Sequence, residues 1–325
     1  MNLPTLLVGS ALLGALLAVP FAADAEAPVE VAANVSVTIL SSNLANGKTI
    51  GEWGLSALVE LDGRCILFDA GRYPDTVIRN ARVLDIDLSC ATDVVLSHFH
   101  FDHTTGLLPL IAELRPRNPA AMRTFHVAQG FFASRRMPAS SGDAEVNQMI
   151  GLRGELEAAG VTIIEYAEPT RIGPAVWVTG PVERTNPERN YSPALRIKVD
   201  GEWVEDPVPD SQALAVQGPI VLLGCGHAGA VNTLEQVQRA IQPHSIHALM
   251  GGMHLFAADD ETLKWTAAKL RDIGVQHLMA GHCTGIEPLI RLRAGLDLDR
   301  RTAVVGAVGS RFVYGEGIHP TAIAQ

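Results

Sequence analysis

The sequence has no excess of basic residues. Of its 325 residues, 25 are Lys or Arg and 35 are Asp or Glu, which gives a formal net charge of −10 at pH 7. A domain that binds nucleic acid normally carries a basic patch that neutralises phosphates, so we expect no nucleic-acid partner. The sequence also lacks the Gly-rich phosphate loop of nucleotide hydrolases and the Gly-x-Ser-x-Gly elbow of serine hydrolases. Nucleotide hydrolysis and serine catalysis are therefore without support.

Charged residues are missing from the segment 3–23, which is rich in Leu, Ala, Val and Gly. Ala23, Asp24 and Ala25 then match the small-x-small pattern of a signal-peptidase site. We therefore expect residues 1–25 to be a signal peptide and the protein to be exported to the periplasm. The same run is long enough to span a bilayer if it stays uncleaved. In that case the segment is a membrane anchor and the protein's only contact with the membrane.

Cysteine is scarce, with four residues in the chain. Export would place them in an oxidising compartment, where they can pair. Cys65 lies in a strand-like run and Cys90 just before another, so these two could form a bridge. Cys225 and Cys283 lie inside histidine-bearing motifs, which makes a structural disulfide between them less attractive. The sequence alone does not assign the pairing.

The remaining residues, 26–325, predict a single α/β domain. Hydrophobic residues make up 47% of the chain and charged residues 18%, which is typical of a compact globular protein. Short β-rich runs lie early in the chain, and the last third repeats a strand–loop–helix pattern. The region around 115–209 is less regular and rich in Pro, Arg and Asn, as expected of an insertion that shapes a pocket mouth.

Helix signals in the second half of the chain are local and specific. The apolar spacing predicts a helix over 144–159 and another over 260–273, the latter ended by Gly274. Asn232 and Glu235 resemble a capping box at the start of a third helix.

The segment Leu96–Gly106, LSHFHFDHTTG, places three histidines and an aspartate within six positions. In an extended chain, residues two apart project to the same side, so His98 and His100 can bind one cation together. A turn at the start of the following helix can direct Asp102 and His103 toward a second cation. Imidazole nitrogen and carboxylate oxygen suit zinc, and also iron or manganese. A chance cluster is a poor explanation, and we predict two divalent metal ions, with zinc as the first expectation.

Further ligands must come from later in the chain. His227, His254 and His282 each follow an apolar strand and lie among glycines. Sheets of α/β proteins gather their sites at the C-terminal ends of the strands, so we predict His227 and His282 as metal ligands. His254 and Cys225 are possible metal or substrate ligands. We assign structural or surface roles to the other histidines: His126, His244, His247, His277 and His319.

Other polar residues allow two interpretations each. Asp69 ends a strand-like run, where it either caps a turn or orients a ligand histidine from behind. Four arginines of the 115–209 region either admit an anionic ligand or are solvated surface charges: Arg135, Arg136, Arg184 and Arg189.

The motif SHFHFDHTTG resembles the His-x-His-x-Asp-His signature of the metallo-β-lactamase superfamily, and ILFDAG resembles the strand that precedes it there. Together with GCGHAG, GGMHL and GHCTG, the motifs are similar to a subgroup named for an archaeal synthase of methanopterin biosynthesis. That synthase acts on dihydropterin and ribofuranosyl-aminobenzene phosphate. The resemblance spans about residues 35–285.

The resemblance implies a four-layer αββα sandwich, the metallo-β-lactamase fold, with its metal site at one edge of the two sheets. By position, the signature residues His98, His100, Asp102 and His103 would be ligands, and His282 would be the last histidine. Either Cys225 or His227 could occupy the position that bridges the two cations. A clear GHTxG motif is absent from the sequence.

We therefore predict a metal-dependent hydrolase that uses a metal-activated hydroxide on a small-molecule substrate, with Asp102 as the catalytic residue that orients the nucleophile. Lactones, thioesters, amides and phosphoesters remain open as substrates. Group transfer between two bound substrates, as the subgroup name suggests, is the first alternative. A non-catalytic periplasmic metal-binding protein is the second.

Overall fold

The computed structural model describes residue 1 and residues 34–216, 220–241 and 245–324. The expected signal peptide or anchor over 1–25 lies outside the described residues, apart from Met1, and so does His244. Among the described helices, none combines the length and the apolar character needed to cross a bilayer.

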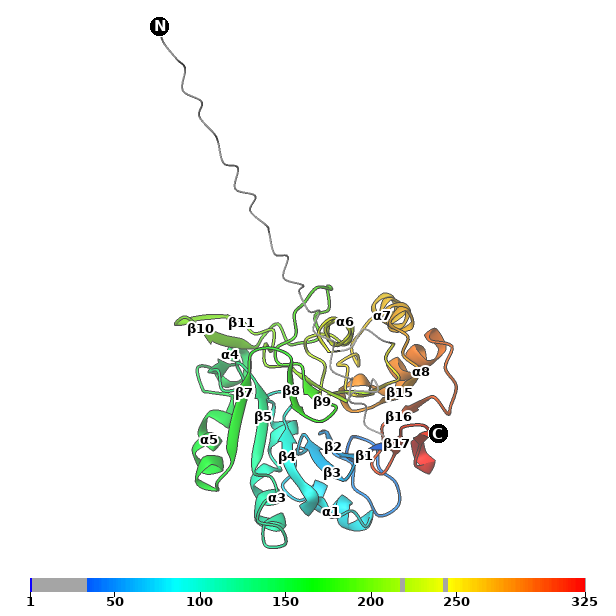
Figure 1. The fold of residues 1–325 in the computed structure, drawn as a ribbon, viewed down its shortest axis with the longest axis horizontal. Coiled ribbons are helices and arrows are strands. Elements are labelled where there is room, and N and C mark those ends of the chain that lie inside the picture. Colours follow the sequence, from blue (N-terminus) through cyan, green and yellow to red (C-terminus); the bar gives the residue numbers. More distant parts are fainter. Residues whose placement is uncertain (2–33, 217–219, 242–244, 325) are drawn as a thin grey trace.

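Two large sheets pack face to face (Figure 1). The first has eight strands in the order β18-β17-β1-β2-β3-β4-β5-β7 and the second has seven, in the order β16-β15-β14-β13-β12-β9-β8. The strands of the first sheet are β1 (Val35–Ser41), β2 (Ser56–Leu61), β3 (Arg64–Phe68), β4 (Ala91–Val95), β5 (Thr124–Ala128), β7 (Thr162–Tyr166), β17 (Arg311–Val313) and β18 (Gly317–His319). Those of the second are β8 (Thr170–Gly173), β9 (Val176–Val178), β12 (Ala213–Val216), β13 (Ile220–Leu223), β14 (Ala248–Gly251), β15 (His277–Ala280) and β16 (Ala303–Val305).

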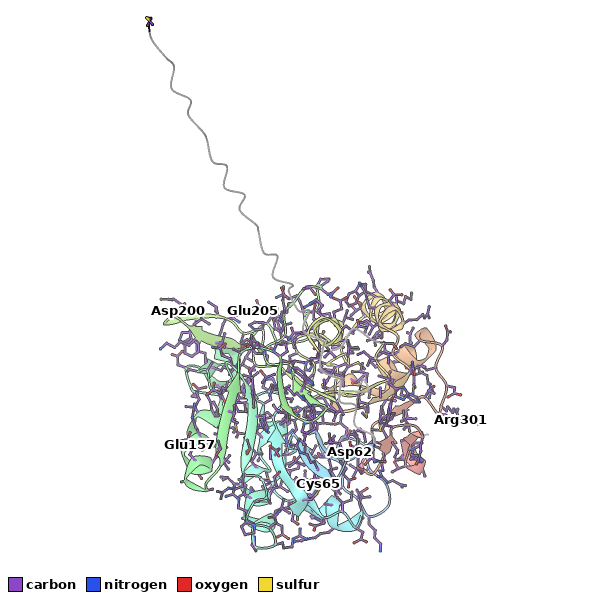
Figure 2. All side chains as sticks on the ribbon, viewed as in Figure 1. Asp62, Cys65, Glu157, Asp200, Glu205 and Arg301 are labelled. Atoms are coloured by element: carbon purple, nitrogen blue, oxygen red, sulfur yellow. A yellow bond between two sulfur atoms is a disulfide. The ribbon has the colours of Figure 1, made fainter. Side chains whose placement is uncertain are left out.

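A small third sheet comes from the 115–209 region. It joins β6 (Arg135–Arg136), β10 (Arg196–Val199) and β11 (Glu202–Glu205). Asp200, in the turn between the last two strands, and Glu205 lie at the outer margin of the molecule (Figure 2).

Helices cover the outer face of each large sheet (Figure 1). α1 (Thr76–Val83), α3 (Leu107–Leu114) and α5 (Gln148–Ala158) lie against the first sheet, and α6 (Ala230–Ala240), α7 (Asp260–Ile273) and α8 (Ile286–Gly295) against the second. The short elements are α2 (Phe101–Thr104), α4 (Pro138–Ser141), η1 (Leu88–Cys90), η2 (His282–Thr284) and η3 (Ala322–Ala324). The predicted four-layer αββα sandwich is confirmed.

The apolar strands are buried on both faces, and their alternation builds three cores. In β13, Ile220 and Leu222 face the core between the sheets, whereas Val221 and Leu223 face the core under the helices. A strand with helices on one side and a second sheet on the other has no polar face, which is why these segments read as continuous apolar runs.

Local helix signals were partly correct. α7 has the predicted bounds and ends at Gly274, whose φ of +85° is the left-handed conformation that glycine adopts without steric cost. α5 is shorter than the predicted 144–159 and begins after Asn147, whose side chain accepts a hydrogen bond from the amide of Met149.

The predicted capping box of α6 is wrong. The helix begins earlier, and the Glu188 carboxylate accepts hydrogen bonds from the amides of Val231 (3.2 Å) and Asn232 (2.9 Å). The Asn232 side chain instead accepts hydrogen bonds from the amides of Thr185 and Asn186. A carboxylate from a loop more than 40 residues away replaces the local cap, which no local pattern can reveal.

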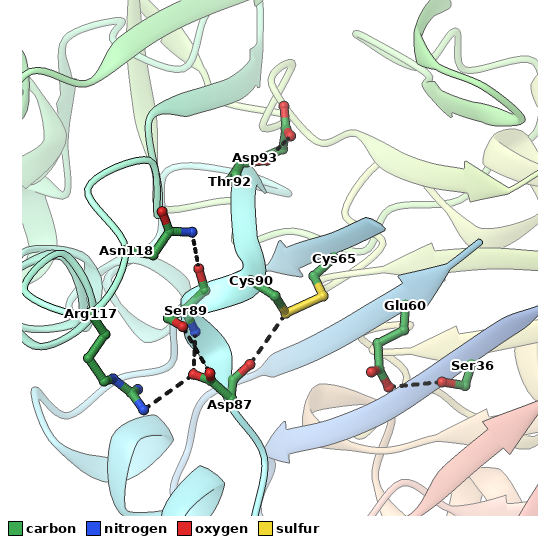
Figure 3. Close-up of a disulfide and its surroundings, with 10 residues drawn as sticks. All are labelled: Ser36, Glu60, Cys65, Asp87, Ser89, Cys90, Thr92, Asp93, Arg117 and Asn118. Atoms are coloured by element: carbon green, nitrogen blue, oxygen red, sulfur yellow. Dashed lines mark hydrogen bonds and ion pairs between the residues drawn. A yellow bond between two sulfur atoms is a disulfide. The ribbon is translucent and has the colours of Figure 1, made fainter. Parts of the chain in front are cut away.

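One disulfide joins Cys65 and Cys90, as the sequence allowed (Figure 3). It ties the start of β3 to the residue before β4, with a Cα–Cα distance of 5.6 Å. Cys225 and Cys283 are free and buried.

Replacing both Cys65 and Cys90 with serine is expected to lower the free energy of unfolding by about 3 kcal/mol, because the bond closes a loop of 25 residues in the unfolded chain. Urea unfolding of the oxidised protein and the double variant measures the difference. Activity should stay the same, because the bond lies at the opposite ends of β3 and β4 from the histidine loop. Equal unfolding midpoints would contradict this expectation.

Candidate metal centre

Strand order brings the predicted ligands to one edge. β13, β14 and β15 are parallel neighbours, so their C-terminal ends lie side by side and are followed by His227, His254 and His282. The segment 98–103 follows β4 of the other sheet, and His100 has the extended backbone (φ −60°, ψ 144°) just before α2. Both sheets therefore contribute residues to one site.

Three imidazoles meet at the first part of the site. The Nε2 atom of His98 lies 2.8 Å from Nδ1 of His100, and the Nε2 atom of His227 lies 3.2 Å from the same Nδ1. His98 and His227 are buried.

A carboxylate and two further imidazoles form the second part. The Oδ2 atom of Asp102 lies 3.3 Å from Nε2 of His282 and 3.7 Å from Nε2 of His103. All three residues are buried.

Cys225 lies between the two parts. Its sulfur is 3.2 Å from Nε2 of His103. Its sulfur also lies within 4.8 Å of ligand atoms of His98 and His227 on one side and of Asp102 and His282 on the other. Of the two residues considered for the bridging position, the structure places Cys225 between the parts and His227 in the first one.

His254 and Cys283 form a third group with Cys225, again with ligand atoms within 4.8 Å of one another. The sequence predicted His254 at the site but gave Cys283 no ligand role. The position of Cys283 next to His282 could have indicated this role, because the short helix η2 buries both side chains.

Three of the inner imidazoles are held from behind through the other ring nitrogen. Nδ1 of His98 contacts Ser97 Oγ at 2.9 Å, and Nδ1 of His227 donates to the carbonyl of Asn190. Nδ1 of His103 donates to Asp69 at 2.7 Å. These contacts direct the Nε2 atoms toward the centre, as the outer hydrogen bonds of metal-binding histidines do.

Asp69 therefore contacts a predicted ligand rather than only capping a turn. Its carboxylate also accepts hydrogen bonds from the amide (2.8 Å) and the hydroxyl (2.7 Å) of Ser97. Gly224 passes so close that a Cβ there would lie 1.9 Å from Ser97 Oγ, so only glycine lets the end of β13 bring Cys225 to His103.

Electrostatics keep the first part of the site neutral. Burial lowers the pKa of His98 and of His227 far below the usual value, and it lowers the pKa of His100 to about 3. Neutral imidazole is the form that binds a metal ion.

The second part of the site is charged. Burial opposes ionisation of Asp102, but His103 and His282 outweigh it and lower the pKa of this carboxyl. Burial also disfavours protonated His103, yet Asp69 and Asp102 raise its pKa to about 9. A cation bound at Nε2 of His103 would displace a proton, because a histidine ligand must be neutral. Imidazole, carboxylate and thiolate donors together fit divalent cations such as zinc.

Residues predicted to lie outside the site do so where they are described. His126 contacts Asp93 (3.0 Å) and Tyr166 (2.8 Å), and it has a structural role. The rings of His247 and His277 contact each other at an interplanar angle of 49°, and exposed His319 pairs with Glu316.

The four arginines of the 115–209 region each have a protein partner. Arg135 is 0% exposed and pairs with Asp206 and Asp210, so its interpretation as a solvated surface charge was wrong. The partners of the others are Asp143 for Arg136, the Pro207 carbonyl for Arg184 and Glu205 for Arg189.

Comparison with known proteins decides the family. The family model described as the metallo-beta-lactamase superfamily matches residues 54–195. A protein of Methanocaldococcus jannaschii, named only as uncharacterized, is 30% identical over 259 residues that cover 79% of this chain and 93% of that protein. The chain belongs to the metallo-β-lactamase superfamily.

Two further similar proteins are informative. The 7,8-dihydropterin-6-methyl-4-(β-D-ribofuranosyl)-aminobenzene-5'-phosphate synthase of M. jannaschii is 29% identical over 268 residues, which cover 78% of this chain and 89% of the synthase. Tm1679, described as a metal-dependent hydrolase of the β-lactamase superfamily, superposes with a TM-score of 0.64 at 24% identity. That superposition covers 81% of this chain and 93% of Tm1679, and it shows the shared metallo-β-lactamase fold.

Proposed function

We propose that this superfamily member is a metal-dependent hydrolase of a small-molecule substrate. One divalent cation would be held by His98, His100 and His227, and a second by Asp102, His103 and His282, with the Cys225 sulfur between them. The observation that supports this assignment is the convergence of imidazole nitrogens at one edge, where three of the imidazoles (His98, His103 and His227) are fixed from behind by an outer hydrogen bond.

A bound cation pair supplies water of lowered pKa, about 7 at zinc, and polarises the substrate oxygen. The protein's own groups provide the rest. Asp102 is ionised, so a free carboxylate lone pair can accept a hydrogen bond from the attacking water and orient it. A cavity of about 270 Å³, lined in part by His100, Asp102 and His254, gives a small molecule access to this edge of the sheets.

We also propose that the protein works in the periplasm after export, either released or anchored through the 3–23 segment. The Cys65–Cys90 disulfide supports this location, because such bonds form and persist in oxidising compartments.

Group transfer is the second candidate. It is supported by the 29% identity to a synthase and by a second cavity of about 740 Å³, which shares His254 with the first. Two adjoining cavities could hold two substrates. Transfer would require both substrates for turnover, whereas hydrolysis requires only one and water.

Elemental mass spectrometry of the chain purified without chelator tests the proposal. We expect two equivalents of zinc, iron or manganese, and turnover of a single ester with one ¹⁸O atom from labelled water in the acid product. One equivalent would contradict the assignment of two cations. No metal after reconstitution would refute the site and every function built on it. Bound metal with no turnover of any substrate would leave only the metal-binding role.

A further inference from the structure

The cavity above the metal-binding residues is apolar. Its volume is about 270 Å³, close to the lower limit of small-molecule sites. Beside the predicted ligands, its walls are formed by six apolar side chains: Trp53, Phe99, Phe101, Met137, Val146 and Leu195. Three of these, from Met137 onward, belong to the 115–209 region, which therefore shapes the pocket.

The wall offers no fixed positive charge. Among the described residues, none of those that line this cavity is Lys or Arg. The buried Arg135 guanidinium stacks on Phe99, with 3.9 Å between Cζ and the ring centroid, and it is neutralised by Asp206 and Asp210. Arg72 stacks on Phe101 at 4.9 Å and is not part of the cavity wall.

The adjoining cavity does not supply a free cation either. Arg189 is the single Lys or Arg among its described lining, and it pairs with Glu205 at 2.5 Å. Acidic residues of the same lining, Glu188, Asp259 and Glu261, add negative charge. An anionic group on the substrate would therefore find no partner beyond the metal ions themselves.

We propose that the substrate is a carboxylic ester or lactone whose acyl group is uncharged and apolar, an inference that rests on the proposed hydrolase function. The metal ions would take the reacting carbonyl, and the acyl group would lie against the six apolar side chains. Burial of apolar surface favours this pose, whereas a charged group in the same place would lose its hydration without gaining a partner.

The reaction balances as a simple hydrolysis. The oxygen of water bonds to the carbonyl carbon, and the bond from that carbon to the alcohol oxygen breaks. The alcohol oxygen takes a proton from the water, and the carboxylic acid product releases its own proton to solvent. Neither an oxidant nor a second substrate is needed.

A matched pair of esters tests the proposal on the metal-loaded protein. 4-Nitrophenyl valerate and mono-4-nitrophenyl glutarate share a leaving group and a similar chain, but the second ends in a carboxylate. We expect kcat/KM to be at least about tenfold higher for the valerate, because the cavity offers the carboxylate no cation. Equal rates, or a faster glutarate, would overturn the proposal.

Bis(4-nitrophenyl) phosphate distinguishes the possible failures. If metal-loaded protein hydrolyses this diester faster than the valerate, the hydrolase function stands and the acyl substrate class is wrong. If the protein binds two metal ions but releases 4-nitrophenolate from none of the three compounds, the hydrolase function itself fails and the substrate proposal fails with it.

Met137→Lys places a cation in the wall with little change in side-chain length. We expect it to reduce the preference for valerate over glutarate about tenfold. The control is Val204→Lys on β11, an exposed position that does not line the cavity, where the preference should be unchanged. An equal change in both variants would contradict the proposed position of the acyl group.

Discussion

Replacing His100 with alanine is expected to lower kcat/KM for 4-nitrophenyl valerate by about 10³-fold. Its Nδ1 atom is the point where His98 and His227 meet, at 2.8 and 3.2 Å, so the first cation would lose a ligand from the middle of its set. A bound metal contributes several kcal/mol of transition-state stabilisation, and about 4 kcal/mol corresponds to 10³ in rate. Metal content, measured on the same sample, should fall by about one equivalent.

Two variants calibrate this result. Asp69→Asn removes the charge behind His103 but leaves the imidazole in place, so we expect a smaller loss, about 10- to 100-fold. His319→Ala removes an exposed histidine outside the site and should leave both rate and metal content unchanged. A His100→Ala protein that retains both metal equivalents and full activity would show that this residue is not a ligand.

The largest loss of stability is expected from Arg135→Met. Arg135 is fully buried, with Nε 2.7 Å from Asp206 Oδ2 and a second bond to Asp210. Removing one partner of a buried ion pair leaves uncompensated charge, which costs about 3–5 kcal/mol. Asp210 also accepts a hydrogen bond from the amide of Phe99 at 2.9 Å, so the unpaired carboxylate would lie directly against the histidine segment.

Chemical unfolding at pH 8 measures this loss against a neighbouring control. Arg136→Met removes an ion pair with exposed Asp143, which should change the free energy of unfolding by less than about 1 kcal/mol. Equal effects of the two substitutions would contradict the assigned role of Arg135. A triple variant, Arg135→Met with Asp206→Asn and Asp210→Asn, should recover part of the stability because it leaves no unpaired charge.

The pH dependence of this variant has a definite sign. Burial raises the pKa of Asp210 from 3.8 to about 6, although Arg135 acts in the opposite direction. A carboxyl whose pKa is raised on folding favours the native state at low pH, and that contribution is lost as pH rises from about 4 to about 6. Without Arg135 the pKa of Asp210 rises further, so the pH range over which this contribution is lost extends above pH 6. The destabilisation caused by Arg135→Met should therefore be smaller at pH 5 than at pH 8.

Sequence reasoning reached the residues that converge at the candidate metal centre because their signals are local. Three histidines and an aspartate in six positions are rare, and His227, His254 and His282 each follow a short apolar strand among glycines. The apolar runs also indicated strands, which the structure buries on both faces, since such runs fit only between two packed layers.

The roles of residues that act through distant contacts were harder to predict from the sequence. Arg135 looked like one of several surface arginines, because its two aspartates lie more than 70 positions later. Glu188 caps α6 from another loop, and Cys283 joins the site through the turn after β15. Each role depends on which chain segments meet, and spacing along the sequence carries no record of that.

The sequence by itself determined the donor chemistry: the histidines, carboxylates and cysteines that can meet at the strand ends, and the apolar strands that deliver them. Only the tertiary structure decided that Cys225, rather than His227, lies between the two parts of the site. It also decided that Asp69 orients His103 and that the cavity wall has no cation of its own among the described residues. The physical reason is that ligand type is a property of one side chain, whereas bridging, orientation and pocket charge depend on distances between segments that only folding brings together.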